Sequence, residues 1–414
     1  MNTSIRVVAT VAAAAAVLAT SACSTKSNDG EASETEGVTT STGVKDGRIQ
    51  LGMMVDLSGT FAPIGNELSQ AAKLYWKQKN DDGGVCNKFP VDLVVKDNAY
   101  NVQTTVSLYS ELKDSVLAFQ NVLGSAPVLA ITKSLKADDK LAVLHGQGQE
   151  TLGHDNILMT GATFDLEAMN GLGYLRDDGE IAKGDTVGHI YLEGSYGEGV
   201  LEGVEQFADA NDMSVESTQI TPTVSDLTPA VGDLKSKDVD ALVVSGSPPQ
   251  LASAATAASA AGLDVPIVGS TPTWTAGLLE TPAAKALRDN LYVAFPVASF
   301  ENKVAAQFRK DYLAAHPGEN PSLQIVLEYS EARALDAVLE KACELGDLTP
   351  AGVMEARKEI SSLDTDGVTP ELDLSDSARA ATAEQFIARV DDVPGGLRVV
   401  DGPYASTEAK EAVK

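Results

Sequence analysis

Small and polar residues follow six apolar segments of the sequence, where their backbone and side-chain groups could bind a small molecule. They occupy residues 56–59, 124–126, 146–149, 194–197, 245–247 and 269–271. Glycine and serine let backbone N–H groups approach a ligand closely. The first N–H groups of a following helix also carry a partial positive charge that suits a carboxylate. Any one of these segments alone could equally be an ordinary strand-to-helix turn.

The residue patterns of common enzymes are missing from the sequence. The four histidines (His145, His154, His189 and His316) lack the spacing of a zinc site. There is no G-x-S-x-G or G-x-x-x-x-G-K-[ST] motif, and no pair stands out among the 59 acidic residues. We therefore predict no catalytic residue, no metal and no cofactor, with an exported hydrolase as a minor alternative.

The segments that must position these residues alternate between strand and helix patterns. Short apolar stretches occur at 48–58, 89–99, 116–127 and 140–149. Between the first three of them, segments 66–81 and 101–115 carry apolar residues at helical spacing. The same alternation resumes from 185 to 272, and the two runs are broken near residues 160–180. Such alternation predicts an α/β fold with parallel sheets in two lobes. In such sheets, ligands bind beyond the carboxyl ends of the strands.

The N-terminus has the pattern of an export signal. Arg6 precedes an apolar run at residues 7–20, shorter than the roughly 20 residues that span a membrane. We predict a signal peptide at 1–22, a lipid on Cys23 and a flexible, polar tether at 23–46. Because Thr20-Ser21-Ala22 also resembles an ordinary cleavage site, secretion without a lipid is the alternative.

Charge and cysteine content narrow the possible partners. The net charge of −28 argues against binding nucleic acid or anionic lipid head groups and predicts a well-solvated acidic surface. Apart from Cys23, the chain contains only Cys86 and Cys343. In an exported protein these two can form a disulfide, which we predict; two separate buried thiols are the alternative.

Several longer strings resemble one family of binding proteins. These are residues 49–85 with their Leu-Ser-Gly turn, 188–207 with a Tyr-Gly pair, 257–274 with Gly-Leu-x-x-Pro-Ile-x-Gly, a returning helix at 328–342 and a closing strand at 367–377. Together they resemble the type I periplasmic binding proteins, in particular the branched-chain-amino-acid-type substrate-binding proteins of ABC importers. The resemblance implies two doubly wound lobes joined by a three-crossover hinge. Lobe 1 would comprise 47–162 plus 298–360, and lobe 2 163–297 plus 361–414.

The resemblance also implies where a ligand would bind. Carried over by position, the contacts are Phe61, Gly124, Ser125, Gly146, Gln147, Gly148 and Gln149 in lobe 1, and Phe164, Tyr196, Thr271 and Trp274 in lobe 2. The Tyr196 ring would form a wall of the cleft and its hydroxyl group a polar contact. In the simpler interpretation, Tyr196 only packs its own turn.

The sequence departs from the amino-acid binders of this family at the expected site. They place a carboxylate after the Ile-x-Gly strand to hold the ligand's ammonium group, whereas this chain has Ser270-Thr271-Pro272. A buried ammonium without a counter-charge would be unstable. We therefore expect a small amide, a carboxylic acid, or a neutral or aromatic solute, with Gln147 and Gln149 as hydrogen-bonding groups. A branched-chain-amino-acid-like solute is the alternative.

The resemblance implies a solute-binding lipoprotein, not an enzyme. It would lie at the cell surface or in the periplasm, bind its solute between the lobes as a monomer and deliver it to the permease subunits of an ABC importer. A binding protein that reports its ligand to a membrane signalling partner is the alternative.

Overall fold

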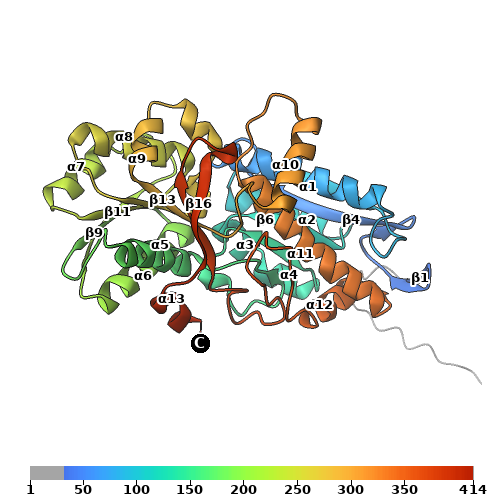
Figure 1. The fold of residues 1–414 in the computed structure, drawn as a ribbon. Coiled ribbons are helices and arrows are strands. Elements are labelled where there is room, and N and C mark those ends of the chain that lie inside the picture. The colour runs from blue at the N-terminus through green and yellow to red at the C-terminus, as the bar shows by residue number, and fades with distance from the viewer. Residues whose placement is uncertain (1–31, 414) are drawn as a thin grey trace, which may run out of the picture.

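The computed structural model describes residues 32–413, which form two α/β lobes lying side by side (Figure 1). The predicted signal peptide and Cys23 lie outside the described residues. Within them, no helix is both long enough and apolar enough to cross a membrane.

Lobe 1 is built on a six-stranded sheet. Its strands are β3 (Val44–Lys45), β4 (Arg48–Val55), β5 (Val91–Asp97), β6 (Ala118–Leu123), β7 (Ala142–His145) and β8 (Ile157–Leu158). The strands β5-β4-β6-β7-β8 run parallel in that order, and β3 pairs antiparallel with β4. The helices of this lobe are α1 (Ala62–Asp81), α2 (Val102–Leu112), α3 (Ser125–Leu129), α4 (Thr132–Ala137), α10 (Lys303–Ala315), α11 (Gln324–Glu344) and α12 (Pro350–Lys358).

Lobe 2 is built on a seven-stranded sheet in the order β10-β9-β11-β12-β13-β15-β16. Its strands are β9 (Thr186–Leu192), β10 (Ser214–Ile220), β11 (Ala241–Ser245), β12 (Ile267–Gly269), β13 (Leu291–Phe295), β15 (Gln385–Val390) and β16 (Leu397–Tyr404). The first five strands in this order are parallel, whereas β15 and β16 are antiparallel to their neighbours. The helices are α5 (Phe164–Asp178), α6 (Ser195–Ala210), α7 (Thr228–Ser236), α8 (Pro248–Ala261), α9 (Ala284–Asn290) and α13 (Thr407–Ala412).

The chain crosses between the lobes three times: from β8 to α5, from β13 to α10, and from α12 to β15. Strand β11 is buried along its whole length, as expected of a parallel strand covered on both faces. The sequence Ser-Pro-Pro-Gln forms a capping box at the start of α8, and Gly262 ends that helix in the left-handed conformation. The predicted fold class, two parallel-sheet lobes joined by three crossovers, is confirmed.

The predicted tether is wrong for the part of it that the structure describes. Strands β1 (Ser33–Thr35) and β2 (Val38–Thr40) form a hairpin, and β2 pairs with β14 (Asp347–Leu348). The Val38 side chain is buried, and the hydroxyl group of Thr40 lies 3.1 Å from that of Ser33. A polar segment folds here because its hydrogen bonds are satisfied by a strand some 300 positions away in the chain.

The closing strand predicted at residues 367–377 is also wrong. This stretch forms only an isolated bridge between Leu363 and Leu372, and the Asp373 carboxylate accepts a hydrogen bond from the N–H of Ser375 at 2.9 Å. Such local side-chain bonds compete with a strand ladder. The lobe 2 sheet is closed by β15 and β16 instead. The interruption predicted near 160–180 between the two runs of strands and helices is a crossover between the lobes followed by helix α5. The sequence pattern did not predict this helix.

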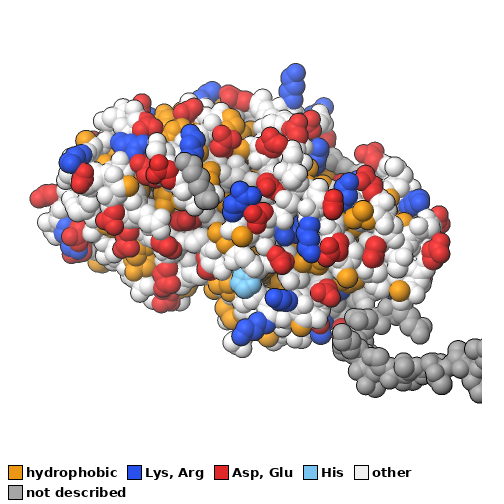
Figure 2. Space-filling model, turned by 90° about the horizontal axis from the view of Figure 1, so that it is seen from below, with side chains coloured by type: hydrophobic (Ala, Val, Ile, Leu, Met, Phe, Trp, Pro, Cys, Tyr) orange, Lys and Arg blue, Asp and Glu red, His pale blue; other side chains and the backbone are white. Residues whose placement is uncertain are grey.

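Cys86 and Cys343 are joined by a disulfide, with sulfur atoms 2.00 Å apart. The bond links the turn after α1 to the last turn of α11, two helices that pack against each other. On the face of the molecule shown in Figure 2, acidic and basic side chains are intermixed over both lobes.

Gly197 provides a test of how closely helix α6 packs on the strand before it. A Cβ atom at this position would lie 1.9 Å from the carbonyl oxygen of Leu192. We expect Gly197→Ala to lower the free energy of unfolding by about 1–3 kcal/mol, as overpacking does. In the matched variant Gly232→Ala, the new Cβ atom meets no atom within 4 Å. The higher helix propensity of alanine should raise the free energy of unfolding of this variant by up to about 1 kcal/mol. Urea unfolding of both variants measures the difference; equal stabilities would contradict the packing.

Candidate ligand-binding site

Two adjoining cavities lie between the lobes, beyond the carboxyl ends of the parallel strands. The first, here called the aromatic cavity, is lined by Phe61, Ile64, Tyr100, Leu123, Gly124, Ser125, His145, Gly146, Phe164, Tyr196 and Pro272. The second, the polar cavity, is lined by His145, Gly146, Gln147, Thr160, Gly161, Ala162, Phe164, Glu167, Thr271, Pro272, Pro296, Leu327 and Gln385. Their empty volumes, including space open to solvent, are about 320 and 340 Å³. Because they share four residues, we treat them as one cleft.

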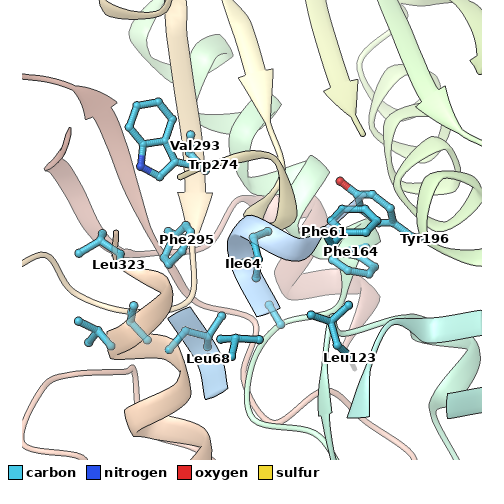
Figure 3. Close-up of a cluster of buried hydrophobic side chains, with 14 of the residues drawn as sticks. Phe61, Ile64, Leu68, Leu123, Phe164, Tyr196, Trp274, Val293, Phe295 and Leu323 are labelled. Atoms are coloured by element: carbon cyan, nitrogen blue, oxygen red, sulfur yellow. The ribbon is translucent and has the colours of Figure 1, made fainter. Parts of the chain in front are cut away.

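Aromatic rings from both lobes meet in this cleft. The ring of Phe61 lies 4.6 Å from that of Tyr100 within lobe 1 and 6.3 Å from that of Tyr196 in lobe 2, measured between centroids. Phe164 lies 4.8 Å from Tyr196. Figure 3 shows Phe61, Phe164 and Tyr196 grouped together, with Ile64 and Leu123 nearby. These rings make one end of the cleft apolar.

The position of Phe61 depends on the buried carboxylate of Asp56. This carboxylate accepts hydrogen bonds from the backbone N–H groups of Phe61 at 2.8 Å, Ser58 at 3.2 Å and Gly59. It therefore holds the turn between β4 and α1. Since its oxygens are engaged in this turn, Asp56 is a structural residue and not a counter-charge for a ligand.

The Tyr196 ring forms a wall of the aromatic cavity, but its hydroxyl group does not face a ligand. The hydroxyl hydrogen-bonds to the hydroxyl of Ser270 and donates to the carbonyl oxygen of Gly246 at 3.3 Å. All three residues belong to lobe 2. The ring therefore has the predicted place, whereas the predicted polar contact is made within the lobe.

A buried carboxyl group, that of Glu167, lies in the polar cavity. Its Oε1 atom accepts hydrogen bonds from the backbone N–H and the hydroxyl group of Thr271, the latter at 2.7 Å. Burial raises the pKa of Glu167 to about 8, so the group is neutral near pH 7. Nearby, the amide of Gln147 is occupied within lobe 1, donating to Leu144 O at 2.7 Å and accepting from Thr160 N at 3.2 Å.

His145 connects the cleft to a buried hydrogen-bond network in lobe 1. Its Nδ1 lies 3.0 Å from Glu331, and the amide of Asn121 donates to both Glu328 and Glu331 at 2.7 Å. Burial lowers the pKa of His145 to about 4 and raises the pKa of both glutamates well above their usual range. Although possible ligand atoms of the three titratable residues lie within 4.8 Å of one another, the Asn121 donor is directed at both carboxyl groups. Protons shared among His145, Glu328 and Glu331 therefore fit this arrangement better than a bound cation, because the Asn121 N–H group would point toward the cation.

The structure brings eight of the eleven predicted site residues into the cleft. They are Phe61, Gly124, Ser125, Gly146, Gln147, Phe164, Tyr196 and Thr271.

The other three predicted residues, Gly148, Gln149 and Trp274, line neither cavity. The amide of Gln149 donates across the lobes to Gly199 O at 3.0 Å. Trp274 is fully buried and donates to Gly395 O at 3.2 Å, and Figure 3 shows it beside Val293, away from the three grouped rings.

Sequence reasoning missed Tyr100, Leu123, His145 and Glu167 as cleft residues. The sequence contained evidence that could have placed two of them in the cleft. His145 directly precedes the predicted Gly146. Glu167 follows Phe164 by three positions, and residues at that spacing share a helix face.

The two lobes, the three crossovers and a cleft at the strand ends define a two-lobed solute-binding protein. The model of the periplasmic binding protein family matches residues 48–396, and the chain belongs to this family. The predicted family and its solute-binding function are thereby confirmed. Members of such a family act outside the cytoplasm.

Solved structures share this fold. A fatty acid ABC transporter substrate-binding protein from Thermomonospora curvata is 33% identical, with a TM-score of 0.88 and coverage of 91% of this chain and 97% of that one. A branched-chain amino acid ABC transporter protein from Thermus thermophilus with bound valine has a TM-score of 0.78 but is only 16% identical, covering 88% and 99%. No curated protein sequence matches the chain.

Tyr196 can be tested with two variants that separate its ring from its hydroxyl group. Tyr196→Ala removes the wall of the aromatic cavity and should weaken the binding of any stabilising solute by about 1–3 kcal/mol. Tyr196→Phe keeps the ring but leaves Ser270 without this partner, so the free energy of unfolding should fall by about 1–3 kcal/mol while affinity stays close to that of the wild type. Calorimetry and urea unfolding measure the two effects. A larger affinity loss in Tyr196→Phe than in Tyr196→Ala would contradict this assignment.

Proposed function

We propose that the protein captures an apolar carboxylic acid, with a fatty acid as the first candidate, and delivers it to an ABC importer. The observation that carries this proposal is the apolar end of the cleft, formed by rings from both lobes beside a polar end. An alkyl chain would pack against Phe61, Phe164 and Tyr196, and its carboxyl group would lie in the polar cavity.

The charges around the cleft support an acid held by neutral groups. Among residues 32–413, no lysine or arginine lines either cavity. Two titratable residues of the cleft are Glu167 and His145. Burial raises the pKa of Glu167 and lowers the pKa of His145, so both side chains are neutral near pH 7. The 33%-identical relative from Thermomonospora curvata, a fatty acid ABC transporter substrate-binding protein, supports the same ligand class.

The proposal includes the predicted lobe ranges and binding role. Lobe 1 would be 47–162 plus 298–360 and lobe 2 163–297 plus 361–414, a division that the membership of the two sheets supports. We propose that the protein has no catalytic activity and that the eight predicted residues in the cleft contact the solute.

A thermal-shift series tests the ligand class. Octanoate, decanoate and palmitate should stabilise the protein, whereas leucine and valine should not. A ligand at 100 times its Kd adds about 2.7 kcal/mol of stability. Phe61→Ala should abolish most of the shift; Leu345→Ala, at a side chain that is 55% exposed, should leave it unchanged. Stabilisation by leucine or valine alone would replace the fatty acid with an amino acid, and recovery of a chemically altered ligand would favour a hydrolase.

We also propose a lipid on Cys23 that holds the monomeric protein at the outer face of the cell membrane. The support is the sequence pattern at residues 1–23 and the extracytoplasmic role of the family. Cys23→Ala should move the protein from the membrane fraction to the soluble fraction of cells, as immunoblotting would show. Unchanged membrane association would contradict the anchor.

A further inference from the structure

We propose that Glu167 is the head-group anchor of the cleft, and that its neutral carboxyl group donates a hydrogen bond to the carboxylate of the ligand. This inference rests on the proposed function, since it assumes a ligand with a carboxylate. It makes Glu167 a residue that determines which head group the cleft accepts.

The geometry at Glu167 leaves one oxygen for a ligand. The side chain is 3% exposed and lines the polar cavity. Both donors of Thr271 bind its Oε1 atom, and Oε2 has no hydrogen-bond partner within residues 32–413. In a neutral carboxylic acid one oxygen accepts as a carbonyl and the other carries the proton. Oε1 therefore takes the carbonyl role, and the Oε2 hydroxyl is left to donate into the cavity.

The groups that face Glu167 come from three other elements. Thr271 follows β12, Tyr196 is the second residue of α6, and His145 ends β7 across the polar cavity. A negative charge on Glu167 would raise the pKa of the Tyr196 hydroxyl group. On its own helix, Asp165 also has a pKa raised by burial. None of these groups is a permanent cation that would hold Glu167 ionised. Desolvation therefore dominates, consistent with the pKa of about 8.

His145 gives the head group a second contact, from lobe 1. Its Nδ1 is held by Glu331 at 3.0 Å, and its Nε2 has no hydrogen-bond partner among the described residues. When Glu331 is protonated and donates to Nδ1, Nε2 carries the ring proton and can donate to a ligand. A carboxylate between Glu167 and His145 would thus connect the two lobes through neutral donors.

A ligand ammonium group would use the same site in the opposite way. It would need Glu167 ionised, so its affinity would rise with pH through the pKa of Glu167. A carboxylate needs Glu167 protonated, so its affinity must fall as pH rises through that value. The two head groups are distinguished by the sign of the pH dependence.

The test measures decanoate and palmitate binding by calorimetry at pH 7, 8 and 9. The protonated fraction of a group with a pKa of about 8 falls about tenfold from pH 7 to 9, so the wild-type Kd should rise about tenfold. In Glu167→Gln, the side-chain amide donates at every pH, so the Kd should change less than twofold over this range. Glu198→Gln removes an exposed carboxylate in the first turn of α6 and should keep the wild-type pH dependence.

A second measurement does not depend on any variant folding. At pH 8.5 the wild-type protein should take up about 0.8 proton per decanoate bound, measured by calorimetry in two buffers of different ionisation enthalpy. No proton uptake, or a pH dependence that persists in folded Glu167→Gln, would overturn the role of Glu167 and leave the fatty-acid function standing. Failure of the wild type to bind any of the fatty acids would instead overturn the proposed function.

Discussion

The contact between Phe61 and Tyr196, with ring centroids 6.3 Å apart across the cleft, shows the constraint on which the site depends. Parallel strands of both lobes end at the cleft, and helices follow these strands. Phe61 immediately precedes α1, Phe164 is the first residue of α5, and Tyr196 is the second residue of α6. Positions that often present polar groups to a ligand thus present rings, and the cleft becomes apolar.

The electrostatic character of the cleft follows from this apolar lining. Water is excluded from groups beside the rings, and desolvation favours the neutral form of every titratable side chain. His145 and Glu167 are both shifted in that direction. Behind His145, two glutamates and Asn121 hold protons in a network that no described salt bridge to lysine or arginine neutralises. The cleft is therefore a region with little fixed charge in a protein whose net charge is −28.

Much of the architecture was predictable because it depends on local patterns. Apolar strands alternating with amphipathic helices indicated two parallel sheets, and the strand ends indicated the cleft. The errors involve contacts between distant residues. Residues 33–40 looked like a tether because their partner strand lies at 347–348. Trp274 was expected in the cleft, but its indole N–H donates to Gly395, in the short 3-10 helix Pro394–Gly396 before β16.

The sequence by itself determined the fold class, the family and the turns that line the cleft, because periodicity and small residues at strand ends are local properties. The tertiary structure decided which side chains share a cavity and in which protonation state. The Glu167 carboxyl group lies beside Thr271, which follows β12, but it comes from α5, about 100 residues earlier in the chain. Its neutral form depends on burial by both lobes, and burial is a property of the assembled structure rather than of any segment.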